Sequence, residues 1–268
     1  MDMTTIFGLL AGLAALIGGF LLEGGQFGGL LKLTAALIVF GGTFAAVIIS
    51  FPLSRLRTIP QALKFAFTKP EYHQNELMDE LTEFASITRR HGLLAIEKRV
   101  SAHPNEFLRE GLLMTIDGTD PQLIRQILEL EMDVAEQKHE NHAKMFESAG
   151  GYAPTMGIIG TVMGLIHVLG NLTDPSTLGA SIAIAFTATL YGVVSANLIY
   201  LPIASKIQTR SQDELQHMEF IMQGILAIQA GEHPHVVRRK LNSMLLVEDP
   251  SITLLQLKKK AIEHETQE

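Results

Sequence analysis

One apolar stretch near the middle of the chain limits the fold more than any other feature. Between Ser148 and Ser205 the only formally charged residue is Asp174. A membrane-spanning helix needs about 20 mostly apolar residues, so this stretch is long enough for two spans. The segment Asn171–Pro175 supplies the polar turn between them. The stretch therefore predicts a transmembrane hairpin rather than the core of a soluble domain.

Two more spans are predicted near the N-terminus, at Thr4–Leu22 and Leu33–Leu53. The glycine-rich segment Glu23–Gly29 lies between them and fits a tight reversal of the chain, because glycine supplies the backbone freedom that such a turn needs. The first span lacks the basic residues that precede the apolar part of a cleavable signal peptide. We therefore expect it to be retained as a membrane helix.

The charged side chains are confined to two parts of the chain. Outside residues 55–147 and 206–268 the only ones are Asp2, Glu23, Lys32 and Asp174. The sequence therefore predicts an all-α integral membrane protein with four transmembrane helices, a helical cytoplasmic loop and a helical tail. The predicted parts are a first transmembrane hairpin (1–54), a cytoplasmic helical domain (55–147), a second hairpin (148–205), and a cytoplasmic helix and tail (206–268).

The basic residues near the span ends set the expected orientation, since cytoplasmic loops carry an excess of Lys and Arg. The two short hairpin loops contain only Lys32. The span ends that adjoin the long polar segments carry Arg55, Arg57, Lys138, Lys144, Lys206 and Arg210. Both polar segments, and with them both termini, are therefore predicted to be cytoplasmic.

The polar segment 55–147 shows helical periodicity. One stripe at helix spacing comprises Leu77, Leu81, Phe84, Ala85 and Thr88, and a second comprises Leu123, Ile124, Ile127, Leu128, Val134 and Ala135. Asp120 followed by Pro121 is typical of a helix start, with an N-cap and a proline at the first helical position. We expect this helix to continue past His142 into the third span. A further cytoplasmic helix is predicted at Gln212–Ile228.

The four predicted spans contain no Asp, Glu, Lys or Arg. An ionisable side chain inside the membrane is the usual mark of an ion pathway. His167 is the one candidate, and a polar contact near the interface is expected for it. If this protein moves ions, the carboxylate that carries them must come from another chain.

No enzyme chemistry is indicated. The chain has no cysteine, which excludes disulfides and thiolate metal sites, and it has no phosphate-binding loop and no G-x-S-x-G motif. The histidine pairs at 139 and 142 and at 233 and 235 lack a third ligand at a suitable spacing for a metal. The sequence therefore predicts no enzymatic activity, no metal site and no cofactor.

The second hairpin is rich in small residues, which let helices approach closely in lipid. Their number predicts packing against other copies of the chain and against a partner helix. Thr161, Thr187 and Thr189 could offer oxygens to an ion or a partner carboxylate. More often, threonines in spans bond to the carbonyl one turn back. Pro154 and Pro202 either mark helix ends or set a bend at the mouth of a pathway.

Three stretches are similar to those of one known family: YAPTMGIIGTVMGLI at 152–166, ATLYG at 188–192 with LPIASK at 201–206, and RRHGLLAIE at 89–97. Together with four spans in two hairpins, they make the chain resemble the MotA family of flagellar motor stator subunits. That family includes PomA and MotP and belongs to the wider MotA/TolQ/ExbB proton channel family. The resemblance covers nearly the whole chain apart from its last residues.

The resemblance implies a torque-generating complex in the bacterial inner membrane. It implies a ring of five copies around two MotB-like chains, each of which supplies a transmembrane helix with an essential aspartate. Inward flow of H⁺ or Na⁺ would load that aspartate, turn the ring and push the rotor protein FliG. Contacts with membrane lipid are expected, and contacts with nucleic acid are not.

The resemblance also assigns roles to residues in the pathway. Pro154 and Pro202 match two functional prolines, and Thr189 matches the threonine that faces the partner aspartate. Thr161 stands where sodium-type members carry threonine, whereas Ala188 departs from their pair of adjacent threonines. Both ions therefore stay open, and the hydroxyl of Thr161 favours sodium.

At the rotor end, Arg89 and Glu97 match the charged residues that engage the rotor. Exposed charges suit a moving contact, because steering works at long range without strong adhesion. Without the resemblance, the same two residues would be expected on an ordinary solvated helix face.

Three other functions remain possible from the sequence. An ExbB- or TolQ-like energy-transducing subunit shares the last hairpin but has three spans. A stand-alone channel or transporter would conduct without a partner. A passive membrane scaffold would tolerate changes at Pro154 and Thr189. The number of spans separates the first of these from a MotA-like protein.

Overall fold

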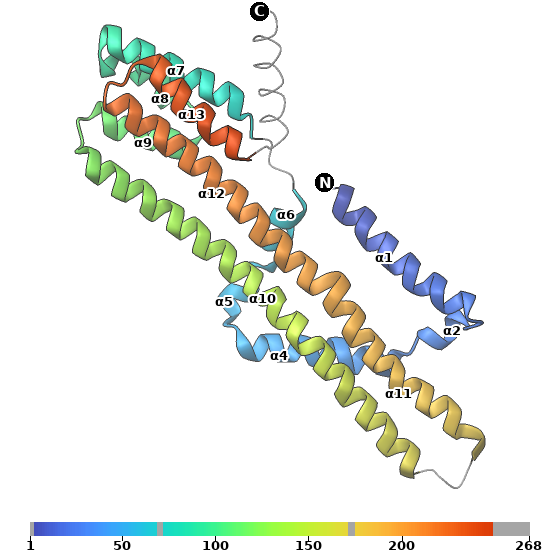
Figure 1. Cartoon of the computed structure of the whole chain (residues 1–268). Coiled ribbons are helices and arrows are strands. Elements are labelled where there is room, and N and C mark those ends of the chain that lie inside the picture. Colours follow the sequence, from blue (N-terminus) through green and yellow to red (C-terminus); the bar gives the residue numbers. More distant parts are fainter. Residues whose placement is uncertain (1–2, 69–71, 171–174, 249–268) are drawn as a thin grey trace, which may run out of the picture. The chain divides into compact units, whose positions relative to one another are not determined.

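The computed structural model describes residues 3–68, 72–170 and 175–248, and no residue in these ranges forms a strand. Four helices of the described chain are long and apolar enough to cross a membrane, so the prediction of an all-α membrane protein is confirmed (Figure 1). Of the turn predicted at Asn171–Pro175, residues 171–174 lie outside the described residues and Pro175 begins a helix. Part of the predicted tail, 249–268, also lies outside them.

The chain divides into two compact units. The first comprises residues 1–70 and 136–212, and the second comprises residues 71–135 and 213–268. Two long helices, α10 (Pro121–Gly170) and α12 (Leu201–Gln229), contribute to both units. The domain boundaries predicted at 54/55, 147/148 and 205/206 stay predictions.

The first hairpin of the first unit begins with α1 (Met3–Leu22) and the short α2 (Phe27–Leu30). Its second span is one continuous helical run, made of α3 (Leu33–Ala36), a π-helical turn η1 (Leu37–Gly41) and α4 (Gly42–Ser50). This run ends before the predicted Leu53 because Phe51, with φ −129° and ψ 140°, is extended. A residue that precedes proline, here Pro52, avoids the helical region.

Two short helices follow, α5 (Leu53–Leu56) and α6 (Ile59–Phe67). On α6 the buried Ala62 and Ala66 pack with Ala143 of α10 and Ile207 of α12. Many large apolar side chains of the first unit are exposed, Leu22 at 91% and Ile49 at 86% among them. Such exposure is expected where lipid rather than water surrounds the helices.

The second hairpin is built on α10 and α11 (Pro175–Ser195). Asp120 caps α10, because its Oδ1 accepts hydrogen bonds from the backbone N–H groups of Gln122 at 2.9 Å and Leu123 at 3.3 Å. The helix then runs for 50 residues without a break, about 75 Å at the usual rise. This confirms the expectation that one helix continues past His142 into the third span.

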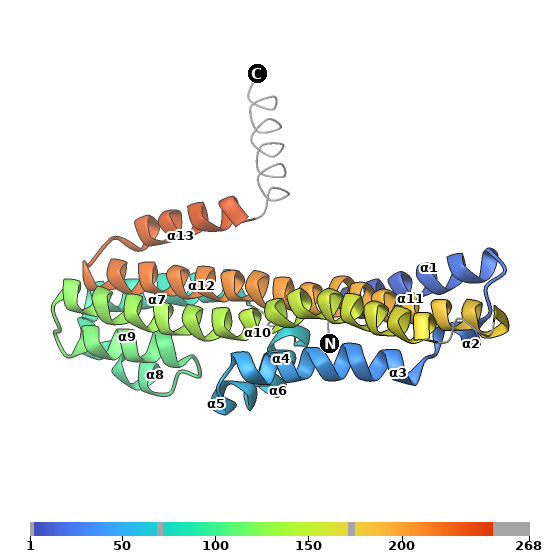
Figure 2. The ribbon, with the colours of Figure 1, turned by 90° about the horizontal axis from the view of Figure 1, so that it is seen from below.

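A second π-helical turn, η3 (Ala196–Tyr200), joins α11 to α12. It ends two residues before Pro202, whose ring lacks an N–H and crowds the carbonyl four residues earlier. A locally widened turn relieves that crowding, and π-turns of this kind often mark functional sites. Within the first unit, α10 runs alongside the α11–η3–α12 helix in both views (Figures 1 and 2).

The second unit packs α7 (Gln74–His91), the 3₁₀ turn η2 (Leu93–Ile96), α8 (Glu97–Ser101), α9 (Glu106–Ile116) and α13 (Pro234–Glu248) with its parts of α10 and α12 (Figure 2). Its core includes Leu81, Phe84 and Ala85, as the first stripe predicts. The prediction from the second stripe is only partly right. Ile124 and Leu128 are buried, but Leu123 and Val134 are exposed on another face of α10.

Two buried histidines of α10 lie in the first unit. The ring of His139 stacks on Phe65 of α6 at a centroid distance of 3.9 Å, and the ring of His142 meets His139 edge-on at 6.1 Å. Burial lowers the pKa of His142, and the nearby His139 and Lys138 lower it further. None of the described residues hydrogen-bonds to Nδ1 of His142, so a proton there would gain no partner.

Stability should therefore fall as the pH drops below 6.5, the ordinary pKa of histidine. In that range the unfolded chain binds the proton more readily than the folded chain does, so acid favours unfolding. His217, whose pKa burial also lowers, contributes in the same direction. The His142→Gln variant should lose less thermal stability than the wild type between pH 7.5 and pH 5.5. A His91→Gln variant, changed at an exposed site, should follow the wild type, and identical profiles for all three would contradict the assignment.

Candidate functional site

Two threonine hydroxyls meet between α10 and α11 in the first unit. Oγ1 of Thr161 and Oγ1 of Thr189 are hydrogen-bonded to each other. Thr161 also lies 3.1 Å from both the Gly157 carbonyl on its own helix and the Ala185 carbonyl of α11. Thr189 lies 3.4 Å from the same Gly157 carbonyl. Four oxygens thus gather at one place, and both side chains are half-buried.

The third candidate hydroxyl does not join this group. Thr187 donates to the carbonyl of Ala183, four residues back, at 2.8 Å. It therefore makes the ordinary intrahelical bond of a threonine in a span. Because a helix turns by about 100° per residue, Thr187 and Thr189 point to nearly opposite sides of α11.

The oxygens meet because the two helices touch backbone to backbone. A Cβ on Gly157 would lie 2.9 Å from the Ala188 carbonyl and 3.0 Å from Cα of Thr189, and a Cβ on Gly192 would lie 2.4 Å from the Ala153 carbonyl. Backbone atoms cannot move aside as a flexible side chain can. These glycines are therefore used for packing within the chain, whereas the sequence suggested that the small residues serve other copies and a partner as well.

The two prolines occupy different places. Pro154 lies on the same seam as the hydroxyls, since a Cβ on Gly192 of α11 would lie 3.1 Å from its Cα. Pro202 is exposed in the first turn of α12, 13 residues beyond Thr189, or about 20 Å along the helix. The structure thus brings Pro154, Thr161 and Thr189 together and leaves Pro202 at a distance.

Polar contacts that the sequence did not predict tie the first hairpin to this seam. The hydroxyl of Tyr191 donates to the Leu30 carbonyl and accepts from the backbone N–H of Lys32 at 3.1 Å. The hydroxyls of Ser50 and Tyr152 are 2.8 Å apart. No local pattern signals either pair, because the partners are more than 100 residues apart in the chain.

A second candidate site lies at a sharp corner of the second unit. There α7 ends at Gly92, whose φ of 84° favours glycine. In the 3₁₀ turn that follows, positions three apart share a face. Leu93 and Ile96 therefore both face the core, where Leu93 is half-buried and Ile96 is buried, whereas Leu94 is 72% exposed. Arg89 before the corner and Glu97 after it are both exposed.

Arg89 and Glu97 differ from nearby Arg99 in being unpaired. Arg99 binds Glu83 at 2.6 Å and lowers the pKa of that carboxyl through its hydrogen bond and its charge. Within the part of the chain that the structure describes, no ion pair engages Arg89 or Glu97. Both are therefore free to meet a partner.

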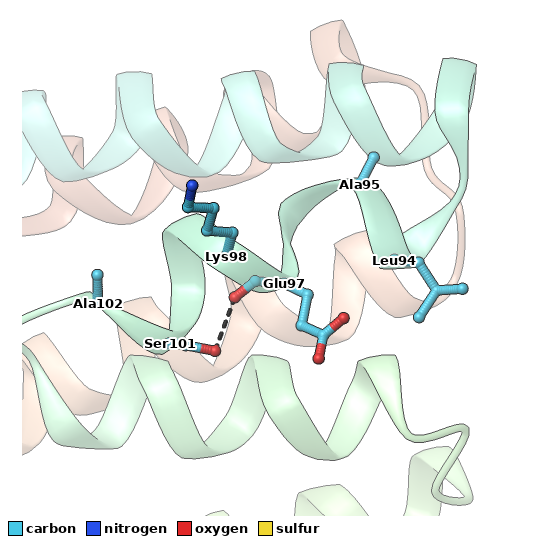
Figure 3. A pocket seen from close by; sticks show the side chains of 6 residues that line it. All are labelled: Leu94, Ala95, Glu97, Lys98, Ser101 and Ala102. Carbon is cyan, nitrogen blue, oxygen red and sulfur yellow. Dashed lines mark hydrogen bonds between the residues drawn. The ribbon is translucent and has the colours of Figure 1, made fainter.

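A shallow hollow of about 460 Å³ adjoins this corner. It is lined by Leu94, Ala95, Glu97, Lys98, Ser101 and Ala102 (Figure 3). The Ser101 hydroxyl donates to the backbone carbonyl of Glu97 at 2.8 Å, so the Glu97 carboxylate is left for other contacts.

Comparison with known proteins shows to which family the chain belongs. The model of the motility protein A N-terminal family matches residues 6–92, and that of the MotA/TolQ/ExbB proton channel family matches residues 99–220. Motility protein A of Bacillus subtilis (strain 168) is 34% identical over 250 residues, which cover 93% of this chain and 93% of that protein. The chain belongs to the MotA family. This confirms the resemblance found in the sequence.

Two further relatives agree with MotA membership. The uncharacterized protein YtxD of Bacillus subtilis (strain 168) is 37% identical over 248 residues, covering 92% of this chain and 90% of that protein. The flagellar MotAB stator complex from Bacillus subtilis contains a chain with a TM-score of 0.88 and 33% identity, covering 96% of this chain and 99% of that chain. Four candidate spans and the match over residues 6–92 favour a MotA protein over a three-span ExbB- or TolQ-like subunit.

The glycine contact that holds the hydroxyls together can be tested directly. In a Gly157→Ala variant the new methyl group would meet immovable backbone, and overpacking of this kind costs about 1–3 kcal/mol. We expect a lower melting temperature for the purified protein in detergent. Gly151→Ala on the same helix is the matched control, because a Cβ there meets nothing within 4 Å. Equal melting temperatures for the two variants would show that the helices are not in contact at Gly157.

Proposed function

We propose that this chain is the stator subunit of a bacterial flagellar motor, which couples inward ion flow to rotation together with a MotB-like partner. The observation that carries the proposal is the oxygen cluster of Thr161 and Thr189 in four spans that contain no carboxylate. Such a cluster is half of an ion site. The solved complex that this chain is similar to contains a MotB chain as well as MotA, which supports a partner that supplies the missing aspartate.

In this proposal the aspartate of the partner helix docks against the seam between α10 and α11. A hydroxyl of Thr189 or Thr161 would give up its bond to the other threonine and donate to the carboxylate. Loading and release of the ion would change the charge of that carboxylate, and so change its attraction to the seam. A ring of five copies around two partner chains would convert successive loading events into steps of rotation.

The oxygen cluster favours sodium as the transported ion. Sodium is a hard cation that needs several oxygen ligands, and two hydroxyls and two carbonyls lie here within reach of a partner carboxylate. A proton would need only the carboxylate and a chain of water. Pro154 on the seam and Pro202 beyond it would shape the route to the cytoplasm.

The rotor would meet the corner of the second unit. Arg89 and Glu97 are exposed, unpaired within the described chain and of opposite charge. Unpaired surface charges steer a partner at long range, while each contact stays weak enough to break at every step. The rotor protein FliG, or its equivalent, is the proposed partner. The protein would lie in the bacterial inner membrane with both termini in the cytoplasm.

Thr189→Val should abolish swimming when expressed with its partner in a stator-deleted strain. Valine keeps the shape of the side chain but removes the donor, and a hydrogen bond to a charged group contributes about 1.5–3 kcal/mol, or about 10- to 100-fold in ion affinity. Thr187→Val is the control and should still swim, because that hydroxyl bonds only within α11. Thr161→Ala should raise the sodium concentration needed for swimming. Swimming without sodium by the wild type would assign the proton instead.

Charge reversal should separate the rotor contact from ion flow. Arg89→Glu and Glu97→Lys should each reduce stall torque in a tethered-cell assay while ion flux through the complex stays at the wild-type level. Arg125→Glu serves as control, because Arg125 is exposed on the same unit but bonded to Glu129 at 2.8 Å. Equal torque in the charge-reversed and control strains would remove these residues from the rotor contact.

A further inference from the structure

An apolar wedge of about 350 Å³ opens between α1 and α11 in the first unit. From α1 its lining includes Leu13, Leu16, Ile17 and Phe20, which recur at helix spacing on one face. Tyr191 of α11 is the only residue of the lining with a polar side chain. Its hydroxyl is already used by the Leu30 carbonyl and the Lys32 N–H. The wedge therefore offers nothing to a polar ligand or to water.

The shape of the wedge follows from contacts at its two ends. At one end α1 touches η3, since a Cβ on Gly12 would lie 3.0 Å from the side chain of Leu198. Beyond this point the wedge lies between α1 and α11. At the other end α2 and Leu31 close the gap, and the two hydrogen bonds of Tyr191 hold that closing segment against α11.

The wedge is lined by apolar side chains and is open on one side. A lipid acyl chain has the width of an aliphatic side chain and can enter from the open side. In a membrane, the open side of an apolar wedge faces such chains.

A cation stands at the rim. Lys32 is the only Lys or Arg among residues 1–54, and its backbone N–H contacts the Tyr191 hydroxyl at 3.1 Å. Basic residues at the ends of membrane helices attract anionic headgroups. Neither Lys32 nor Glu23 lines the wedge itself, but Lys32 follows Leu31 of the lining and its backbone contacts Tyr191.

We propose that this wedge is a phospholipid-binding site, in which one acyl chain fills the space between α1 and α11 and the headgroup phosphate binds Lys32. The bound lipid would fill the wedge between α1 and α11. It would thus keep the first span in place beside the hairpin that carries the threonine pair.

The chain contains no tryptophan, which allows a direct test. Phe20→Trp places a fluorophore in the wedge, and Leu21→Trp places one at the same depth outside its lining. The full chain with its partner is reconstituted into vesicles that contain brominated phosphatidylglycerol or brominated phosphatidylcholine, and the wild-type complex gives the background. Ile17→Trp is the second reporter should Phe20→Trp fail to fold.

We expect bromine to quench the wedge tryptophan, with an apparent affinity about fivefold higher for the anionic lipid, as one lysine near the surface provides. Lys32→Gln should remove this preference, and the tryptophan at 21 should show none. Absence of quenching at position 20 would overturn the proposal, because it would mean that a second protein chain covers the wedge. Equal quenching by both lipids at positions 20 and 21 would also overturn it, because the wedge would then hold only bulk lipid.

Discussion

The backbone contact between α10 and α11 is the constraint on which the candidate ion site depends. Gly157 and Gly192 let the two helices meet without side chains between them, so the Thr161 hydroxyl reaches the Ala185 carbonyl on the other helix at 3.1 Å. Helices with larger residues at these positions pack about 8–10 Å apart, and each threonine would then bond only within its own helix. In lipid, where no hydrophobic force draws helices together, such close contact is itself a main source of association.

The same contact explains why the site is incomplete in a single chain. The threonine oxygens satisfy one another in the absence of a partner, so the seam carries no exposed charge within the membrane. A carboxylate on this chain would have to be buried without a counter-ion, which is costly in hydrocarbon. If the carboxylate lies on a separate helix, its charge is buried only when that helix docks against the threonine donors that stabilise it. The proposed division of the site between two kinds of chain is therefore physically reasonable.

The second unit is held together by a different kind of packing. Its core is a conventional cluster of Leu, Ile and Phe side chains, and near the corner Glu83 and Arg99 form an ion pair. The positive φ of Gly92 breaks α7 and turns the chain so that Leu94, Glu97 and Lys98 project outward. Arg89 and Glu97 remain unpaired on either side of the break. The proposed rotor contact, which would bind and release repeatedly, would require such weak contacts.

Much of this was readable from the sequence. Span number, the long helix from Pro121 and the lack of a membrane carboxylate depend on local counts of apolar and charged residues, which need no knowledge of distant contacts. The sequence singled out Thr189 over Thr187 through its resemblance to the MotA family. Helix spacing, however, could not separate Leu128 from Val134, because the rotation of a helix about its axis is set by what packs against it. Nor could the sequence show that Tyr191 binds the turn before the second span, or that α1 and α11 line one apolar wedge. Those features join residues far apart in the chain, and only the tertiary structure decided them.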